Sequence, residues 1–136
     1  MKQIKKILES RKIRPSLHRL MVLEYIIRRH NHPTPEDIYN DLLTTMPAIS
    51  RATVYNTLHL LQENGLVFSI TIPGEETRYD YKGDSHAHFY CIHCGALRDT
   101  DYKCSCLKKR KIGHNLITEV QVCFRGICEN CQKRTK

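Results

Sequence analysis

The chain contains 136 residues, which is enough for one domain or two small ones. Apolar residues make up 40% of it, so we expect a modest packed core, and no run approaches the roughly 18 apolar residues of a membrane span. The first residues contain no apolar core of a secretory signal, so we expect a cytoplasmic protein without a membrane partner. Seven cysteines in that reducing compartment favour metal binding or thiol chemistry over a disulfide framework.

The net charge of +8 suggests a polyanionic partner, and its distribution along the chain adds detail. Residues 1–19 hold seven Lys or Arg and one Glu, a net charge of +6. Residues 20–80 carry a net charge of −4, and residues 81–136 carry +6. The basic N-terminal segment is a candidate phosphate contact, although a solvated amphipathic helix would show the same pattern.

Residues 1–82 are predicted to form a winged helix-turn-helix domain that ends in a hinge. Apolar periodicity predicts helices over residues 2–10 and 16–29, the second with Leu20, Leu23, Ile26 and Ile27 on its buried stripe. Thr34, which precedes a proline and has an Asp three residues after it, predicts the start of a third helix.

A fourth helix and a hairpin complete this predicted domain. Ser50 is the expected cap of a helix over residues 51–63, and Gly65 follows its end. Two β-branched or aromatic runs, LVFSITI and TRYDY, flank a Pro-Gly turn and predict a hairpin, which would be the wing.

Residues 83–136 are predicted to form a small α/β domain, which makes the whole chain α+β. The runs at 86–101 and 116–128 are expected to be strands, and the Lys-rich segment 106–112 between them is expected to be helical. We place the hinge between the two domains near residues 81–84.

Two CxxC motifs predict a structural zinc site in the second domain. They supply four thiolates, and Zn(II) accepts a closed tetrahedral shell of four sulfurs. A redox dithiol or simple packing of the cysteines would explain either pair alone, but two complete pairs favour zinc. The predicted ligands are Cys91, Cys94, Cys128 and Cys131.

Histidines and carboxylates suggest a second, exchangeable metal site. His86 and His88 are two residues apart on a predicted strand, so both side chains face the same side. Asp80, Asp99 and His32 are further candidates, although each alone fits a turn residue or a solvated charge. Nitrogen and oxygen ligands suit Fe(II), Mn(II) or Zn(II).

The fourth predicted helix has the pattern of a DNA-recognition helix. Its apolar stripe consists of Val54, Leu58 and Leu61. The opposite face carries Arg51, Ala52, Tyr55, Asn56 and His59. Tyr and Asn side chains, together with Arg51 and Thr53 at the helix start, can reach base edges and phosphates in a major groove. The alternative is an ordinary amphipathic surface helix.

Taken together, these motifs resemble the ferric uptake regulator (Fur) family. The matching segments are residues 32–39, 50–58, 65–67, 78–81, 86–91, Cys94-Gly95 and the final CxxC motif. They occur in order and cover nearly the whole chain. The resemblance implies a repressor rather than an enzyme, with an N-terminal winged helix, a C-terminal α/β dimerisation domain, and a homodimer that binds double-stranded operator DNA.

The chain is most similar to the peroxide-sensing repressors of that family. The resemblance implies that a regulatory Fe(II) or Mn(II) is held by His32, Asp80, His86, His88 and Asp99. An Asp at the last position is typical of peroxide sensors, and a Glu is typical of iron sensors. It further implies that peroxide oxidises His32 or His86 of the iron form, after which the metal and the DNA are released.

The family resemblance also assigns DNA contacts to Arg14, Arg19 and Tyr55, and Asn56 is typical of the peroxide sensors. One further metal site of some iron sensors should be absent, because the corresponding positions here are Ser85, Ala87, Cys106 and Val120. The segment between the CxxC motifs is short, which predicts a truncated dimerisation helix.

Three cysteines have no counterpart among the family's ligands. Cys104 and Cys106 lie beside a Lys run that could make them reactive, since nearby cations favour the thiolate, or they are spare surface thiols, as is Cys123. Two other functions therefore stay open: an iron- or zinc-status regulator on the same scaffold, and a zinc-ribbon thiol redox protein.

Overall fold

The computed structural model describes residues 1–29, 31–81 and 87–134, and the chain forms two compact units. The first comprises residues 1–83 and the second residues 84–136. The architecture is α+β, as predicted. Within the described ranges, no helix combines the length and the apolar character that crossing a bilayer requires. Most of the predicted hinge at 81–84 lies outside these ranges, and so does the candidate ligand His86.

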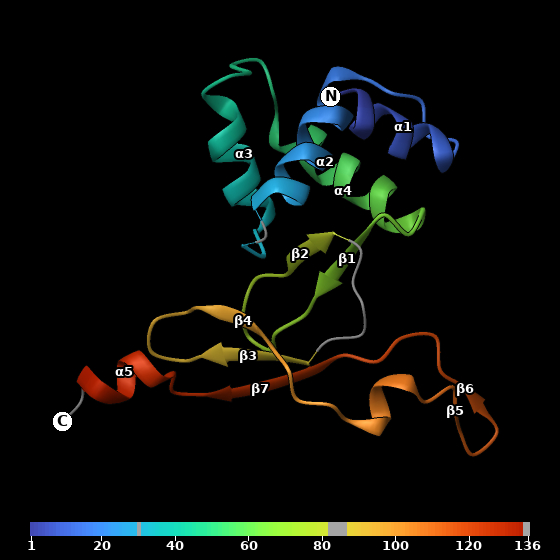
Figure 1. The fold of residues 1–136 in the computed structure, drawn as a ribbon. Coiled ribbons are helices and arrows are strands. Elements are labelled where there is room, and N and C mark those ends of the chain that lie inside the picture. Colours follow the sequence, from blue (N-terminus) through green and yellow to red (C-terminus); the bar gives the residue numbers. More distant parts are fainter. Residues whose placement is uncertain (30, 82–86, 135–136) are drawn as a thin grey trace. The chain divides into compact units, whose positions relative to one another are not determined.

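Helices make up most of the first unit, and they lie close to the predicted positions (Figure 1). The structure places them at α1 Lys2–Ser10, α2 Leu17–Arg29, α3 Pro35–Leu43 and α4 Arg51–Glu63.

Local hydrogen bonds explain where α3 and α4 begin and end. Thr34 Oγ1 accepts the N–H of Asp37 at 3.1 Å, and Asp37 Oδ2 accepts the N–H of Thr34 at 3.0 Å, which is a capping box. Ser50 Oγ accepts the N–H of Thr53 at 3.1 Å. Helix α4 ends before Gly65, whose φ of +72° suits glycine. The predicted caps are therefore confirmed.

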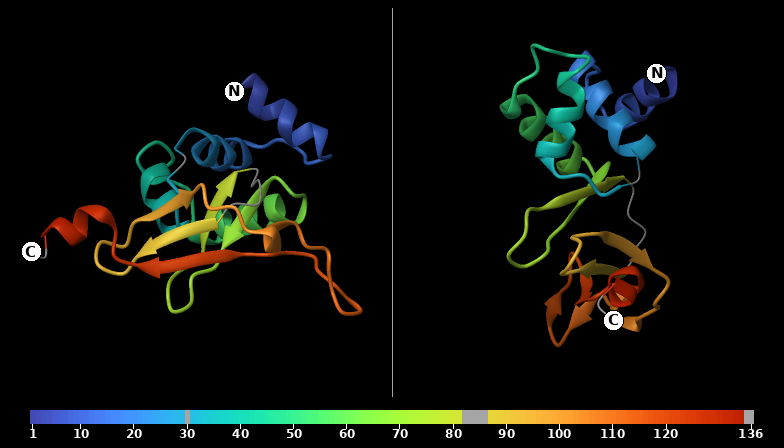
Figure 2. Two further views of the ribbon diagram at one scale, coloured as in Figure 1. Left: turned by 60° about the horizontal axis from the view of Figure 1, so that its bottom comes forward. Right: turned by 90° about the vertical axis from the view of Figure 1, so that its left-hand side faces the viewer.

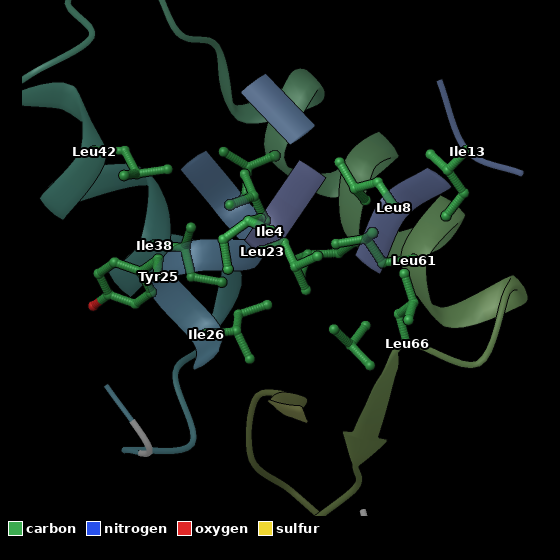
Figure 3. Close-up of a cluster of buried hydrophobic side chains, with 14 of the residues drawn as sticks. Ile4, Leu8, Ile13, Leu23, Tyr25, Ile26, Ile38, Leu42, Leu61 and Leu66 are labelled. Carbon is green, nitrogen blue, oxygen red and sulfur yellow. The ribbon is translucent and has the colours of Figure 1, made fainter. Parts of the chain in front are cut away.

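The core of the first unit lies where the four helices meet (Figure 3). Leu8, Leu23, Leu58 and Leu61 are almost completely buried there, and each such side chain contributes about 1.5–3 kcal/mol of transfer free energy. The buried face of α2 differs from the predicted one. Its buried residues are Val22, Leu23, Tyr25 and Ile26, whereas Leu20 and Ile27 are half-buried.

A short antiparallel hairpin follows α4 and forms the wing. Strand β1 Val67–Ile70 pairs with β2 Arg78–Tyr81, so that Ser69 lies opposite Tyr79. The Gln62 amide of α4 donates to Ser69 Oγ at 2.9 Å and joins the helix to the hairpin. The first unit is thus a winged helix-turn-helix.

The second unit is built on a three-stranded sheet with the order β4-β3-β7 (Figure 2). Strand β3 Ala87–Cys91 runs antiparallel to β4 Leu97–Thr100 and parallel to β7 Val122–Gly126. The run predicted as one strand over 86–101 is therefore two strands, because the first CxxC motif forms the turn between them.

The connection from β4 to β7 departs from the prediction. A single 3-10 turn, η1 Ser105–Lys108, replaces the expected helix and is followed by a hairpin of β5 Lys111–Ile112 and β6 Asn115–Leu116. Lys108 and Lys111 are three positions apart and would be neighbours on the predicted helix, where two like charges repel each other and disfavour it. A disulfide joins Cys104 and Cys106, which the sequence did not predict. The chain ends in α5 Glu129–Arg134, which was also not predicted.

Candidate metal centres and nucleic-acid surface

The four CxxC cysteines come together at one end of the sheet of the second unit. Cys91 is the last residue of β3, Cys94 lies in the turn toward β4, and Cys131 lies on α5, just beyond Cys128. Their ligand atoms all lie within 4.8 Å of one another. The Sγ atoms are 3.8 Å apart for Cys91 and Cys131 and 3.9 Å apart for Cys94 and Cys128.

These sulfur–sulfur distances fit a tetrahedral zinc ion. Zn–S bonds of about 2.3 Å place the corners of a tetrahedron about 3.8 Å apart. The four donors are all sulfurs and leave no position for a water, which is the donor set of a structural site.

Backbone dipoles prepare one of these sulfurs to be a thiolate. The N–H groups of Cys94 and Cys128 donate to Cys91 Sγ at 3.5 and 3.4 Å and lower the pKa of Cys91 to about 5. In contrast, the pKa of Cys131 is raised to about 12, first by hydrogen bonding with Cys128 and then by burial. A metal ion that binds here must displace that proton, so binding weakens as the pH falls.

A histidine–aspartate pair lies in the first unit, at the loop before α3. His32 Nε2 is 3.5 Å from Asp80 Oδ2 on β2, and only 6% of His32 is exposed. The N–H of Tyr79 donates to the carbonyl of Pro33 at 3.0 Å and holds this loop against β2. His32 has φ +50°, which is uncommon for a residue other than glycine, and its imidazole lies next to Asp80 and is not solvated.

A second histidine–aspartate pair lies in the second unit, on the sheet. His88 on β3 is directly opposite Asp99 on β4, so both side chains are on the same face. His88 Nε2 is 3.1 Å from Asp99 Oδ1, and the Asp99 side chain is half-exposed. Each unit therefore carries a nitrogen and oxygen pair of the kind that Fe(II), Mn(II) and Zn(II) accept.

Helix α4 presents the surface that was predicted to bind DNA. Tyr55 is 52% exposed, and Asn56 is also exposed. Arg19, Thr53 and Asn56 line a hollow of about 440 Å³ between α4 and the start of α2. Arg14 is exposed, and its carbonyl accepts a hydrogen bond from the Arg19 guanidinium at 2.8 Å.

Arg51, another predicted DNA contact, has a partner within the protein. Its guanidinium donates to both carboxylate oxygens of Glu36 at 2.9–3.1 Å and lies 4.5 Å from the centre of the Tyr39 ring. The Arg51 guanidinium also holds the pKa of Glu36 below its usual value. No sequence pattern indicated this contact between α3 and α4, because it joins exposed residues 15 positions apart. Arg51 acts at least as a link between the two helices.

Comparison with known proteins identifies the family. The model of the ferric uptake regulator family matches residues 10–120, which is most of the chain. The chain belongs to the ferric uptake regulator family. The peroxide-responsive repressor PerR of Staphylococcus aureus strain Mu50 is 32% identical to it over 125 residues, which cover 90% of this chain and 84% of that protein.

Solved structures agree with the family assignment. The Campylobacter jejuni peroxide stress regulator is 34% identical, with a TM-score of 0.68 and coverage of 96% of this chain and 97% of that one. The Helicobacter pylori ferric uptake regulator Fur is 19% identical, with a TM-score of 0.74 and coverage of 96% and 90%. The second likeness concerns the fold alone. Fur-family members are metal-responsive transcription regulators, and this chain is one of them rather than an enzyme.

Proposed function

We propose that this protein is a cytoplasmic, metal-dependent repressor that binds operator DNA as a homodimer and is released when peroxide oxidises its Fe(II) site. The observation that carries the proposal is the pair of preformed His–Asp contacts, His32–Asp80 in the first unit and His88–Asp99 in the second. Similarity to repressors that respond to peroxide supports the same function.

Both pairs, together with His86, would hold one regulatory metal ion. Because the pairs belong to different units, the ligands would couple the orientation of the winged helix to that of the second domain. The metal can favour the DNA-binding form only by binding it more tightly than the other form. A difference in binding free energy of about 5.5 kcal/mol would shift the ratio of the two forms from 1:99 to 99:1. When Fe(II) is bound it supplies an electron to peroxide, which Mn(II) does poorly. His32, buried beside Asp80, and His86 would be the side chains that gain oxygen.

The cysteine cluster would hold a structural Zn(II) ion that stabilises the dimerisation domain at residues 83–136. The winged helix at residues 1–82 would place α4 in the major groove. Two such helices in a dimer read half-sites about one helical turn, or a multiple of it, apart.

The experiment that tests this proposal measures operator binding by the zinc-containing dimer loaded with either Fe(II) or Mn(II), before and after peroxide. We expect both forms to bind, the iron form to lose its operator at low peroxide, and the manganese form to keep it. The oxygen gained by the iron form should map to His32 or His86 by peptide mass. An iron form that keeps its operator through peroxide would favour a metal-status regulator, and a release that follows oxidation of Cys104, Cys106 or Cys123 would favour a thiol switch.

A Tyr55→Ala variant should bind the operator about 5- to 150-fold more weakly, since a lost base contact costs about 1–3 kcal/mol. Tyr55 is exposed, so the fold and both metal contents should not change. Arg14→Ala is the matched comparison. It should weaken binding to all sequences alike and lower the slope of affinity against salt by about 1, because a phosphate contact acts through released counterions. Equal operator affinity for Tyr55→Ala and the unchanged protein would contradict the placement of α4.

A further inference from the structure

The Cys104–Cys106 disulfide lies outside both metal centres. It occupies the start of the η1 turn, between β4 and β5 of the second unit. The two Cα atoms are 5.2 Å apart, within the range of roughly 4.4–6.8 Å that a disulfide spans. Both cysteines are only half-buried. The bridge can therefore open and close locally, and reagents in solution can reach it.

A cavity with cationic side chains adjoins the bridge. It has a volume of about 560 Å³, and Cys104 lines it together with Tyr102 and three charged residues, namely Lys103, Lys108 and Asp101. Tyr102, at one side of the cavity, is 60% exposed. Its ring packs edge-on against Phe124 of β7, with the ring centroids 5.4 Å apart. A cavity of this size accepts a small molecule, and the surplus of one positive charge, from two lysines against one aspartate, favours a molecule that carries carboxylates.

The bridge and the zinc cysteines lie at opposite ends of the sheet. The cavity is lined by Ala87 and Thr100, which pair at the end of the sheet where β3 begins, whereas Cys91 is at the end where β3 stops. Figure 1 shows η1 and α5 near opposite ends of β7. Chemistry at Cys104 and Cys106 can therefore proceed without disturbing the cysteine cluster.

We propose that Cys104 and Cys106 form a reversible dithiol–disulfide couple that exchanges with anionic low-molecular-weight thiols bound in the adjacent cavity. This redox site requires neither the regulatory metal nor peroxide, and it does not depend on the proposed function.

The exchange consists of two balanced steps. The thiolate of the small thiol attacks Cys106 Sγ, a mixed disulfide forms, and Cys104 leaves as a thiolate. Cys104 is the better leaving group because its thiolate is stabilised. The N–H of Cys106 donates to Cys104 Sγ at 3.3 Å, and Lys103 and Lys108 line the same cavity. A second small thiolate attacks the sulfur of the bound one, which releases the small disulfide and the Cys106 thiolate. The protons of the two small thiols end on Cys104 and Cys106, and the reverse reaction closes the bridge.

The test uses zinc-loaded full-length protein equilibrated with reduced and oxidised glutathione in varied ratios, then alkylated and digested with trypsin. Cleavage after Lys103 and Lys108 yields a peptide of residues 104–108 that contains these two cysteines alone. As the glutathione becomes more oxidised, we expect this peptide to change in one transition from the doubly alkylated form to the internally bridged form. The bridged peptide is lighter by two hydrogens than the free dithiol. A Cys123→Ser variant, which removes a half-buried thiol of β7, should show the same transition.

The cavity's role is tested by the rate at which the bridge opens. Reduced glutathione is anionic and cysteamine is cationic, so the ratio of their rates reports on charge near the sulfur. Because the two thiols differ by two unit charges, a Lys103→Gln/Lys108→Gln variant should lower that ratio about sevenfold for each lysine at low salt, which is about threefold per unit charge from Coulomb's law at about 7 Å in water. Lys133→Gln, on α5 at the other end of the sheet, is the control and should leave it unchanged.

Two results would overturn the proposal. One is a peptide 104–108 that stays doubly alkylated, or carries only glutathione adducts, at every ratio. The other is a rate ratio that does not respond to the two lysines, because the cavity would then play no part in the exchange.

Discussion

A Cys91→Ser variant is expected to lose its zinc and the fold of the second unit, while the first unit stays folded. The reason is the composition of the second unit's core. Its buried side chains in the described ranges include three of the four cluster cysteines, namely Cys91, Cys128 and Cys131, with few aliphatic ones beside them. Zinc binding of about 10–16 kcal/mol would then supply most of the folding free energy of this unit.

The measurement combines metal analysis, gel filtration and circular dichroism. Zinc content should fall to zero and the dimer should dissociate, but the helical signal should largely persist, because α1–α4 all belong to the first unit. Cys123→Ser is the matched control, since it changes a cysteine of β7 that lies outside the cluster, and it should keep one zinc per chain. A dimeric Cys91→Ser protein with full zinc would refute the assignment.

Local signals along the chain were sufficient to predict most of the first unit. Thr34, Ser50 and Gly65 act on the backbone within four residues of themselves, so their effect on α3 and α4 can be read without knowing the fold. The CxxC spacing likewise indicated the cysteine cluster, because each motif brings its own two sulfurs together by a tight turn.

Features that depend on residues distant in sequence could not be predicted in this way. The Arg51–Glu36 contact forms only when α3 and α4 pack together, so a face that indicated DNA binding also serves to join two helices. The short, Lys-rich segment 106–112 was expected to be helical, yet the Cys104–Cys106 bridge and the neighbouring cations favour a 3-10 turn and a hairpin. The pairing of β3 with β7 places Cys123 opposite His88, which no motif indicated.

An Asp99→Ala variant is expected to have the largest effect on the proposed sensing. Asp99 is the one carboxylate that faces His88 in the β3–β4 register among the described residues. Loss of an outer partner of a metal ligand costs 10- to 100-fold in affinity, so loss of a ligand should cost at least about 100-fold. Mn(II) binding and Mn(II)-dependent operator binding should both fall by this amount, at unchanged zinc content. Asp101→Ala, an exposed carboxylate two residues further along, is the matched control and should behave as the unchanged protein.

Asp99→Glu separates metal binding from peroxide sensing. The longer side chain keeps a carboxylate beside His88 but moves it by about one carbon–carbon bond, so the ligand set is conserved and its geometry is not. We expect Mn(II)-dependent operator binding to stay within about tenfold of the unchanged protein, since the affinity depends mainly on ligand identity. The iron form should need more peroxide to release DNA and should gain less oxygen at His32. If Asp99→Glu released DNA at the same peroxide concentration as the unchanged protein, the carboxylate geometry at this position would not determine what the protein senses.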